Sequence, residues 1–231
     1  KSFIVLTGEN GSGKTNLLEA ISLFAPGRGL KNAQLNEIPF LKNDVRSFEI
    51  KLEIKYDTGN IILHRHFSDE NKRKNFITLD EEKINNSELL NYLNILWVTP
   101  IMEKIMLQSN SEKRSFFDRL TFNVNNNHLK NLSKLQKLLK ERLTLLKKVN
   151  YESEWMSILE NKIAEISFVI INDRINFIKV LNRKLSEIKK PFTSCFVEFV
   201  HELDSLDQFI SEEEMFVSKY RSVLEAKRDL D

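Results

Sequence analysis

Residues 8–16 read Gly-Glu-Asn-Gly-Ser-Gly-Lys-Thr-Asn, and this stretch decides the fold. Its members are Gly8, Glu9, Asn10, Gly11, Ser12, Gly13, Lys14, Thr15 and Asn16. They fit the phosphate-loop pattern G-x-x-x-x-G-K-[ST] at every required position. The apolar run 3–6 leads into the loop as a strand would, and apolar residues at helical spacing over 17–23 lead out of it. The sequence therefore predicts a site that binds a nucleoside triphosphate.

Each residue type in the loop has an expected part in holding the phosphates. Gly8, Gly11 and Gly13 have no Cβ, so the backbone can curl and direct several N–H groups at one anion. The helix that follows presents its unpaired first-turn amides to the same phosphates. Lys14 is predicted to reach the β- and γ-phosphates, and the hydroxyl of Thr15 is predicted to coordinate magnesium.

Outward from the loop, the first hundred residues read as loop and β-structure. The run 25–30, Ala-Pro-Gly-Arg-Gly-Leu, must be a loop, in which Arg28 either approaches a bound phosphate or is a solvated cation. Apolar residues predict strands at 47–56, 60–67 and 75–79. The one-sided alternation of the first of these argues for an antiparallel sheet with one face covered. A short apolar run at 95–98 is expected to be a buried strand.

The second half of the chain has the apolar spacing of helices. Leucines at steps of three and four over 129–146, and a second apolar face over 159–188, predict two long helices. Because only a short break separates them, they should form an antiparallel hairpin at about 128–190. The chain is thus expected to have a nucleotide-binding lobe at 1–100 and a helical lobe at 101–231.

Two further elements are expected after the hairpin. Residues 193–200 suggest a strand, in which Cys195 would be a small buried hydrophobe. Ser211 with Glu214 forms a capping-box pattern and predicts a last helix over 211–230.

Composition is that of an ordinary globular protein. The chain has 231 residues, of which 41% are hydrophobic and 29% charged. The single cysteine excludes an internal disulfide, and the sequence shows no apolar run that would cross a bilayer and no leader pattern. These features predict a reducing, cytoplasmic location.

Charge is unevenly distributed along the chain. Residues 101–150 contain eleven Lys or Arg against four Asp or Glu, whereas 151–231 contain eleven against sixteen. A basic stretch in a protein with a phosphate loop raises the expectation of nucleic-acid binding, but a charge run is also the pattern of a solvated helix face. Both interpretations stay open for the lysines of the first long helix: Lys130, Lys134, Lys137, Lys140, Lys147 and Lys148.

Three blocks of the sequence resemble one known family. The first is the loop continued to residue 30, GENGSGKTNLLEAISLFAPGRGL. The second joins LWVTPIM at 96–102 to KRSFFDRL at 113–120, and the third is YESEW at 151–155, ahead of the second long helix. Together, and in this order, they resemble the RecF family of bacterial DNA repair ATPases over nearly the whole chain.

The resemblance implies an α/β fold class. The implied architecture is an ABC-type P-loop ATPase lobe, with a mixed sheet that includes antiparallel strands, plus a helical arm lobe with the long antiparallel hairpin. It implies ATP and Mg2+ as cofactors, held by Gly8 to Thr15. It implies DNA at single-strand/double-strand junctions, RecR and RecO as partners, and an ATP-dependent homodimer that clamps DNA. The implied role is recombinational gap repair, in which the family helps to load recombinase.

Three basic residues match a further block of the family, namely Lys113, Arg114 and Arg119. They could contact DNA. Alternatively, they could tie the two lobes together through a pair such as Arg114 with Asp118, since a contiguous Arg/Asp/Phe block suits a packed joint.

The sequence also departs from the family. An apolar strand that ends in the acidic Walker B pair, and the serine/glycine-rich signature, have no counterpart before Asp231, and the family's first strand would precede Lys1. Because positioning of the γ-phosphate requires those groups, we expect negligible ATP hydrolysis by this chain.

Two alternative functions remain open at this point. One is another SMC-like ATPase with a different partner, because a fold does not determine a function. The other is a P-loop kinase, which would need a substrate lid and an acceptor pocket, and the long helical hairpin matches that requirement poorly.

Overall fold

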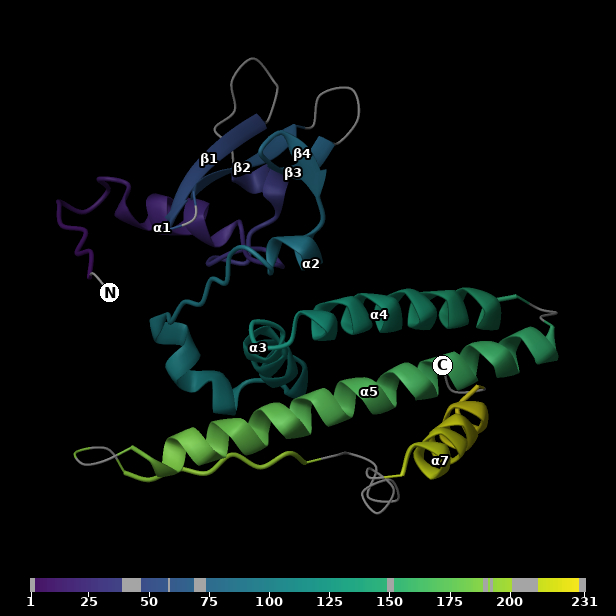
Figure 1. Cartoon of the computed structure of the whole chain (residues 1–231). Coiled ribbons are helices and arrows are strands. Elements are labelled where there is room, and N and C mark those ends of the chain that lie inside the picture. Colours follow the sequence, from purple (N-terminus) through teal and green to yellow (C-terminus); the bar gives the residue numbers. More distant parts are fainter. Residues whose placement is uncertain are drawn as a thin grey trace. The chain divides into compact units, whose positions relative to one another are not determined.

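The computed structural model describes residues 3–38, 47–57, 59–68, 74–148, 152–188, 191, 193–200 and 212–228. The chain divides into two compact units, Lys1–Lys104 (unit 1) and Ile105–Asp231 (unit 2). The division lies close to the predicted lobe boundary at residue 100. The fold class is α/β, with the described strands in unit 1 and the long helices in unit 2 (Figure 1).

Unit 1 contains the helix that follows the phosphate loop and a small antiparallel sheet. Its elements are α1 (Lys14–Ser22), η1 (Leu35–Glu37), β1 (Ser47–Tyr56), β2 (Gly59–Ser68), β3 (Lys74–Leu79), β4 (Glu82–Ile84) and α2 (Asn86–Leu89), and η2 (Pro100–Leu107) crosses the unit boundary. The strands pair in the order β1-β2-β3-β4, each antiparallel to the next. The first three strands coincide closely with the predicted ones, whereas β4 is too short to show a sequence period.

One face of the sheet forms the core of unit 1. Residues of β1 alternate between half-buried and exposed along nearly the whole strand, as expected for a strand with one covered face. Leu63 of β2 and Ile77 of β3 pack with Leu89 of α2 and with Phe24, which comes just after α1. Phe24 therefore anchors the end of the phosphate-loop helix in the core of the sheet.

Arg65 interrupts this apolar face with a charge. It lies on β2 opposite Ile50 of β1 and Ile77 of β3, and only 5% of its surface is exposed. Its Nε has no hydrogen-bond partner among the described residues, and burial lowers the pKa of the guanidinium. Burial of the guanidinium therefore costs free energy, which the apolar contacts of this core must offset.

Two of the strands predicted in unit 1 are absent from the structure at the positions expected. The segments 3–6 and 95–98 are irregular, and Phe3 and Val98 are 99% and 87% exposed. Their apolar composition suggested strands, but a strand also needs a neighbour that satisfies its backbone N–H and C=O groups. In the described part of the chain, the sheet contains no strand that pairs with either segment.

Unit 2 is built of helices. They are α3 (Asn110–Phe122), α4 (Asn126–Leu146), α5 (Ser153–Ser186) and α7 (Glu213–Ala226). Helices α4 and α5 lie side by side, and α7 packs against α5 (Figure 1). Leu159 and Ile163 of α5 are buried in one cluster with Leu224 of α7, and Leu135 of α4 packs against it. The two long helices occupy the segment in which the hairpin was expected.

A charged cluster is buried where α4, α5 and α7 meet. Glu160 of α5 has 0% exposed surface and Arg142 of α4 has 3%. Arg142 donates from Nε to Glu160 Oε1 at 3.1 Å and from Nη2 to the Leu224 carbonyl at 2.8 Å. Arg228, which follows α7, donates from Nε to both carboxylate oxygens of Glu160 at 3.1 and 3.2 Å. One carboxylate therefore joins these elements and balances the charge of a buried guanidinium.

The predicted strand at 193–200 is also corrected. This segment is irregular, and the side chain of Asn182 occupies the hydrogen-bonding groups of its backbone. The Val197 N–H donates to Asn182 Oδ1 at 2.9 Å, and the Val197 carbonyl accepts from Asn182 Nδ2 at 2.8 Å. At Val197 a side-chain amide thus makes the two hydrogen bonds that a neighbouring strand would make. Cys195 is exposed and is not the buried hydrophobe that its sequence context suggested.

The last helix begins within a few residues of its predicted start. Helix α7 starts at Glu213, and its N-cap residue, Glu212, makes no side-chain capping hydrogen bond. Ser211 of the predicted capping box lies outside the described residues. Over the part of the chain that the structure describes, no helix combines the length and the apolar character that a membrane span requires.

Candidate nucleotide-binding site

The phosphate loop ends where α1 begins, and the start of that helix has no cap. Gly13 is the N-cap residue, in a left-handed conformation with φ of 88°, and no side chain caps the helix. The first-turn amides of a helix have no intrahelical partner and need one from elsewhere. They also lie at the positive end of the helix dipole, so the start of α1 favours an anion.

Among the three glycines of the loop, Gly8 is the one at which an added side chain would meet another atom. Its φ is +152°, and a Cβ built on it would lie 2.9 Å from Ser12 Oγ. The backbone turns between these two residues, with the Ser12 N–H donating to the Glu9 carbonyl at 3.2 Å. The loop is therefore a tight turn in which glycine at position 8 leaves space for the Ser12 hydroxyl.

The side chain of Lys14 folds back over this turn. Its Nζ donates to the carbonyls of Gly8 and Glu9 at 2.8 and 2.6 Å, and Ser12 Oγ lies at 3.3 Å. The ammonium group is therefore held by the loop itself, next to the backbone that a phosphate would approach. Thr15 lies in the first turn of α1 and is exposed. The structure thus brings the predicted loop residues together in one local segment.

The residues around α1 include a pair that sequence reasoning missed. Lys31 Nζ lies 2.8 Å from Glu19 Oε2 of α1 and 3.4 Å from Asn16 Oδ1. No motif marks Lys31. It comes close to Asn16 in space only because of how the loop 25–30 folds. That loop is fixed to the helix by the Leu30 N–H, which donates to Ser22 Oγ at 2.7 Å. Arg28 is exposed on the same loop, so both of its expected roles stay open.

The second group of candidate residues lies on α3 of unit 2. Arg114 is exposed, whereas Lys113 and Arg119 are half-buried. Burial lowers the pKa of the Arg119 guanidinium. The block therefore does not form one exposed basic surface.

Asp118, in the middle of this block, is the centre of a buried network between helices. Arg174 of α5 donates to it in a bidentate manner, from Nε to Oδ1 at 2.7 Å and from Nη2 to Oδ2 at 2.8 Å. His128 of α4 places Nε2 3.0 Å from Asp118 Oδ1 and Nδ1 3.0 Å from Oδ2 of Asp173. The sequence could not indicate these contacts, because Asp118 is separated from Arg174 by most of two helices. The structure gives Asp118 a role in joining α3, α4 and α5.

The network determines the charge state of Asp118. Burial by itself would raise the pKa of this carboxyl group, but the hydrogen bonds from His128 and Arg174, together with their charges, outweigh it and hold the pKa below its usual value. Asp118 is therefore a carboxylate over the whole neutral range.

We expect Asp118→Asn to lower the free energy of unfolding at pH 7 by about 2 kcal/mol, because hydrogen bonds to charged groups contribute roughly 1.5–3 kcal/mol. The folded-state pKa is lowered, so this contribution is present above the ordinary aspartate pKa of about 3.9 and is lost as the pH falls through the folded value. The difference in free energy of unfolding between wild type and variant should become smaller below about pH 4. Urea unfolding in a Trp97→Phe background, followed by Trp155 fluorescence at several pH values, measures this difference. A difference in free energy of unfolding that stays constant as the pH is lowered would contradict the proposed role of the Asp118 carboxylate.

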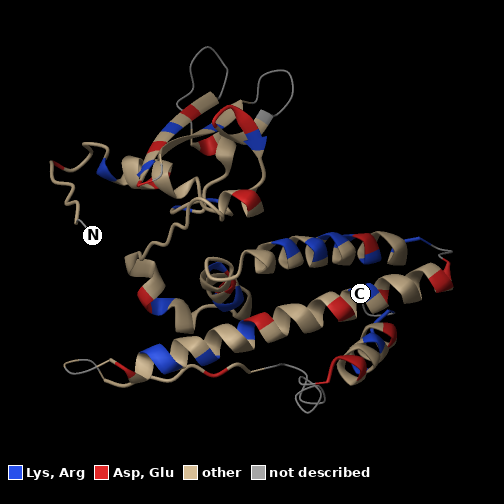
Figure 2. Cartoon of the chain, viewed as in Figure 1, with Lys and Arg blue, Asp and Glu red and all other residues tan. Residues whose placement is uncertain are grey.

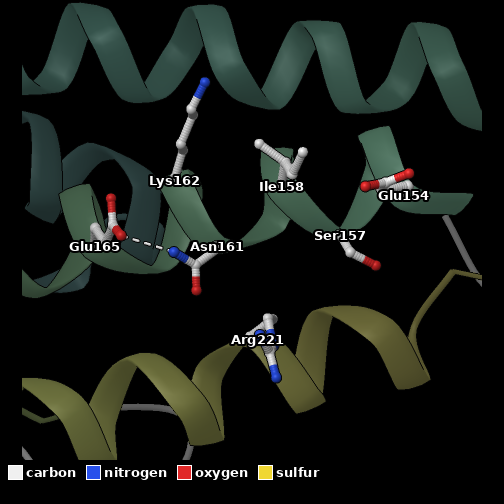
Figure 3. Close-up of a pocket in the computed structure, with 7 residues that line it drawn as sticks. All are labelled: Glu154, Ser157, Ile158, Asn161, Lys162, Glu165 and Arg221. Atoms are coloured by element: carbon white, nitrogen blue, oxygen red, sulfur yellow. Dashed lines mark hydrogen bonds between the residues drawn. The ribbon is translucent and has the colours of Figure 1, made fainter.

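A groove of about 480 Å³ lies between α5 and α7. It is lined by Glu154, Ser157, Ile158, Asn161, Lys162 and Glu165 of α5 and by Arg221 of α7. Figure 3 shows these residues, with the hydrogen bond from Asn161 to Glu165. Its lining contains two acidic and two basic side chains and none of the predicted site residues, so it does not favour a polyanion and is separate from the candidate nucleotide site.

The chain is similar to proteins of known families. A family model described as an AAA domain matches residues 1–214. The DNA replication and repair protein RecF of Rickettsia typhi is 35% identical over 189 residues, which are 82% of this chain and 52% of that protein. The protein of the same name from Rickettsia prowazekii is 36% identical over 189 residues, with the same coverage. The chain therefore spans about half the length of these relatives.

Solved structures show the same fold. The structure of the recombination mediator protein RecF-ATPrS in the RecFOR pathway matches with a TM-score of 0.82 and 22% sequence identity, over 97% of this chain and 61% of that one. The structure of RecF-ATP in the same pathway matches with a TM-score of 0.78 and 23% identity. At these identities the structural matches show the fold alone.

Proposed function

Because the chain carries an AAA domain and belongs to the RecF family of DNA replication and repair proteins, we propose that it binds ATP with Mg2+ and, in that state, binds DNA in recombinational gap repair. The observation that carries the proposal is the phosphate loop. It joins a tight glycine turn, an uncapped helix start and a lysine ammonium in one segment.

The loop residues fit a triphosphate. Gly8 has a positive φ that strains other residues, and its missing Cβ leaves space for the Ser12 hydroxyl. The first-turn amides of α1 have no side-chain cap and remain for an anion. Lys14 is held beside the loop backbone, which is where a phosphate would approach. The Thr15 hydroxyl is a hard oxygen ligand of the kind that Mg2+ accepts. When bound, Mg2+ neutralises charge on the phosphates, while the loop binds and orients them.

The proposed partners follow from the family. We propose that the DNA ligand is a junction between single-stranded and double-stranded DNA, and that RecO and RecR act with the protein on it. Dimerisation with ATP between two copies is the proposed means of clamping the DNA. The support for these proposals is the RecF relatives and the RecFOR pathway that the solved structures name.

This function is tested by measuring whether DNA binding depends on ATP. With ATP and Mg2+, we expect a fluorescently labelled gapped duplex to bind about tenfold more tightly than without nucleotide, which is a typical coupling between two sites. Anisotropy titrations at several salt concentrations measure both the affinity and its electrostatic part. Incubation of the same preparation with small phosphoryl acceptors tests the kinase alternative. DNA binding that is indifferent to ATP, or phosphate transfer to an acceptor, would contradict the proposal.

A further inference from the structure

Lysines recur along the exposed side of α4. The α4 lysine stripe consists of Lys130, Lys134, Lys137, Lys140, Lys147 and Lys148, all of them exposed. Figure 2 shows that Lys and Arg positions predominate along α4, whereas acidic and basic positions are mixed along α5 and α7. The stripe continues past the end of the helix at Leu146, because Lys147 is the C-cap residue.

The opposite side of α4 is used for packing. Leu135 and Leu138 pack against the apolar cluster of α5 and α7, and His128 and Arg142 are buried in the two charged networks. The orientation of the helix is therefore determined by its buried side. The lysine stripe faces away from it as a consequence.

The lysines of the stripe have no acidic partner in the part of the chain that the structure describes. Across the described residues, no ion pair joins any of the six lysines to an acidic group. The helix has one acidic residue, Glu141, which is half-buried. Its other cation, Arg142, is buried and bonded to Glu160. The stripe therefore presents an excess of positive charge to an external partner.

The length of the stripe suits a nucleic-acid backbone. From Lys130 to Lys148 the chain advances about 27 Å at the helical rise of 1.5 Å per residue. Phosphates on one DNA strand are spaced at roughly 3.4 Å along the axis, so the stripe spans about eight of them. Lysine ammonium groups are point charges that contact phosphates without reading bases.

A solvated helix face is the alternative, and neighbouring helices show what such a face looks like here. On α5 exposed Glu154 and Glu165 alternate with exposed Lys162, and on α7 Glu214 is followed by Lys219. Solubility requires charge but not charge of one sign. On α4 the exposed charged residues are all lysines, and this is the observation that favours a polyanionic partner.

We infer that the α4 lysine stripe is the surface by which unit 2 binds the phosphate backbone of DNA, in place of the basic block Lys113, Arg114 and Arg119. The inference rests on the proposed DNA-binding function and adds the surface that performs it. The stripe contributes affinity that is independent of base sequence and falls as salt is added.

The test compares two triple variants with the same change in net charge. One variant carries Lys130→Gln, Lys134→Gln and Lys137→Gln in the stripe. The control carries Lys179→Gln, Lys219→Gln and Lys227→Gln, which are exposed lysines of the same unit outside it. Binding of the complete chain to a gapped duplex with ATP and Mg2+ is measured by anisotropy from low to moderate salt. Circular dichroism and Trp155 fluorescence verify that both variants fold.

The stripe variant is expected to bind about tenfold more weakly or worse at 0.1 M salt, and its slope of log affinity against log salt should fall by two to three, roughly one per lysine that contacts a phosphate. The control should change the slope by less than one. A Lys→Arg version of the stripe variant should retain binding, since arginine keeps the charge.

Two outcomes overturn the inference and can be told apart. Equal losses in the two Gln variants would mean that only net charge matters and that the stripe is not the surface, while the proposed function stands. An absence of DNA binding by the wild-type chain would overturn the proposed function and the inference together.

Discussion

Glu160→Gln lowers the free energy of unfolding of unit 2 by about 3 kcal/mol, the expected loss when one partner of a buried ion pair is removed. Glu160 is fully buried, and it accepts hydrogen bonds from Arg142 and Arg228. The amide keeps the volume of the side chain but removes the charge that balances two guanidinium groups. Arg142 cannot move to water, because it is itself buried and also bonded to the Leu224 carbonyl.

The two tryptophans make this measurement specific to one unit. Trp155 is on α5, close to Glu160, whereas Trp97 is in unit 1. In a Trp97→Phe background, urea unfolding followed by fluorescence reports on unit 2. The matched control is Glu154→Gln, an exposed glutamate of the same helix, which should change stability by less than about 0.5 kcal/mol. Equal effects of the two substitutions would mean that the buried cluster does not hold the helices together.

The second large effect concerns the nucleotide. Lys14→Ala is expected to weaken ATP binding at least tenfold, and calorimetry with Mg2+ should detect little or no heat of binding. A hydrogen bond to a charged group contributes roughly 1.5–3 kcal/mol, which corresponds to a factor of about ten or more in affinity. In the structure the same ammonium group holds the turn by its bonds to Gly8 and Glu9. The substitution therefore removes a ligand of the phosphate and loosens the turn that cradles it.

Lys55→Ala is the control for this experiment, because Lys55 is an exposed lysine of β1 in the same unit. It should leave ATP affinity unchanged within the error of calorimetry. ATP binding by the wild-type chain that survives Lys14→Ala would show that the nucleotide binds elsewhere. Binding by none of the three proteins would contradict the proposal that this loop is a usable nucleotide site.

Local pattern was sufficient for the parts of the fold whose interactions are close in sequence. The loop 8–16 needs only glycines at the turns and a helix behind it, and in the structure it is a tight turn that ends where α1 begins. Its use as a nucleotide site stays a prediction. The hairpin of β1 and β2 follows from alternation and a short turn, with Tyr56 opposite Gly59. The long helices follow from apolar spacing of three and four residues. In the helices each backbone group has its partner four residues away, and in the hairpin the pairing starts at the turn and extends outward along the two strands.

Predictions of strands from amino-acid composition were wrong for three segments, because a strand depends on a partner that can lie far away along the chain. The apolar runs 3–6 and 95–98 and the segment 193–200 look like strands by residue type, yet none is a strand in the structure. A strand is a property of two segments, and a single sequence does not show whether the second one is beside it. For 193–200 the alternative partner was the amide of Asn182, a side chain with no sequence signal for this role.

Patterns in the sequence were enough to identify the loop 8–16, the family and the order of most helices and strands. The roles of the charged side chains became clear only in the folded chain. In sequence, Asp118 is part of a basic block, whereas in the structure it bonds to His128 and Arg174 and connects three helices. Glu160 is buried and is bonded to two arginines. The folded chain also leaves the lysines of α4 facing outward. The physical reason is that a charge contributes according to its burial and its partners, and both depend on segments brought together only by folding.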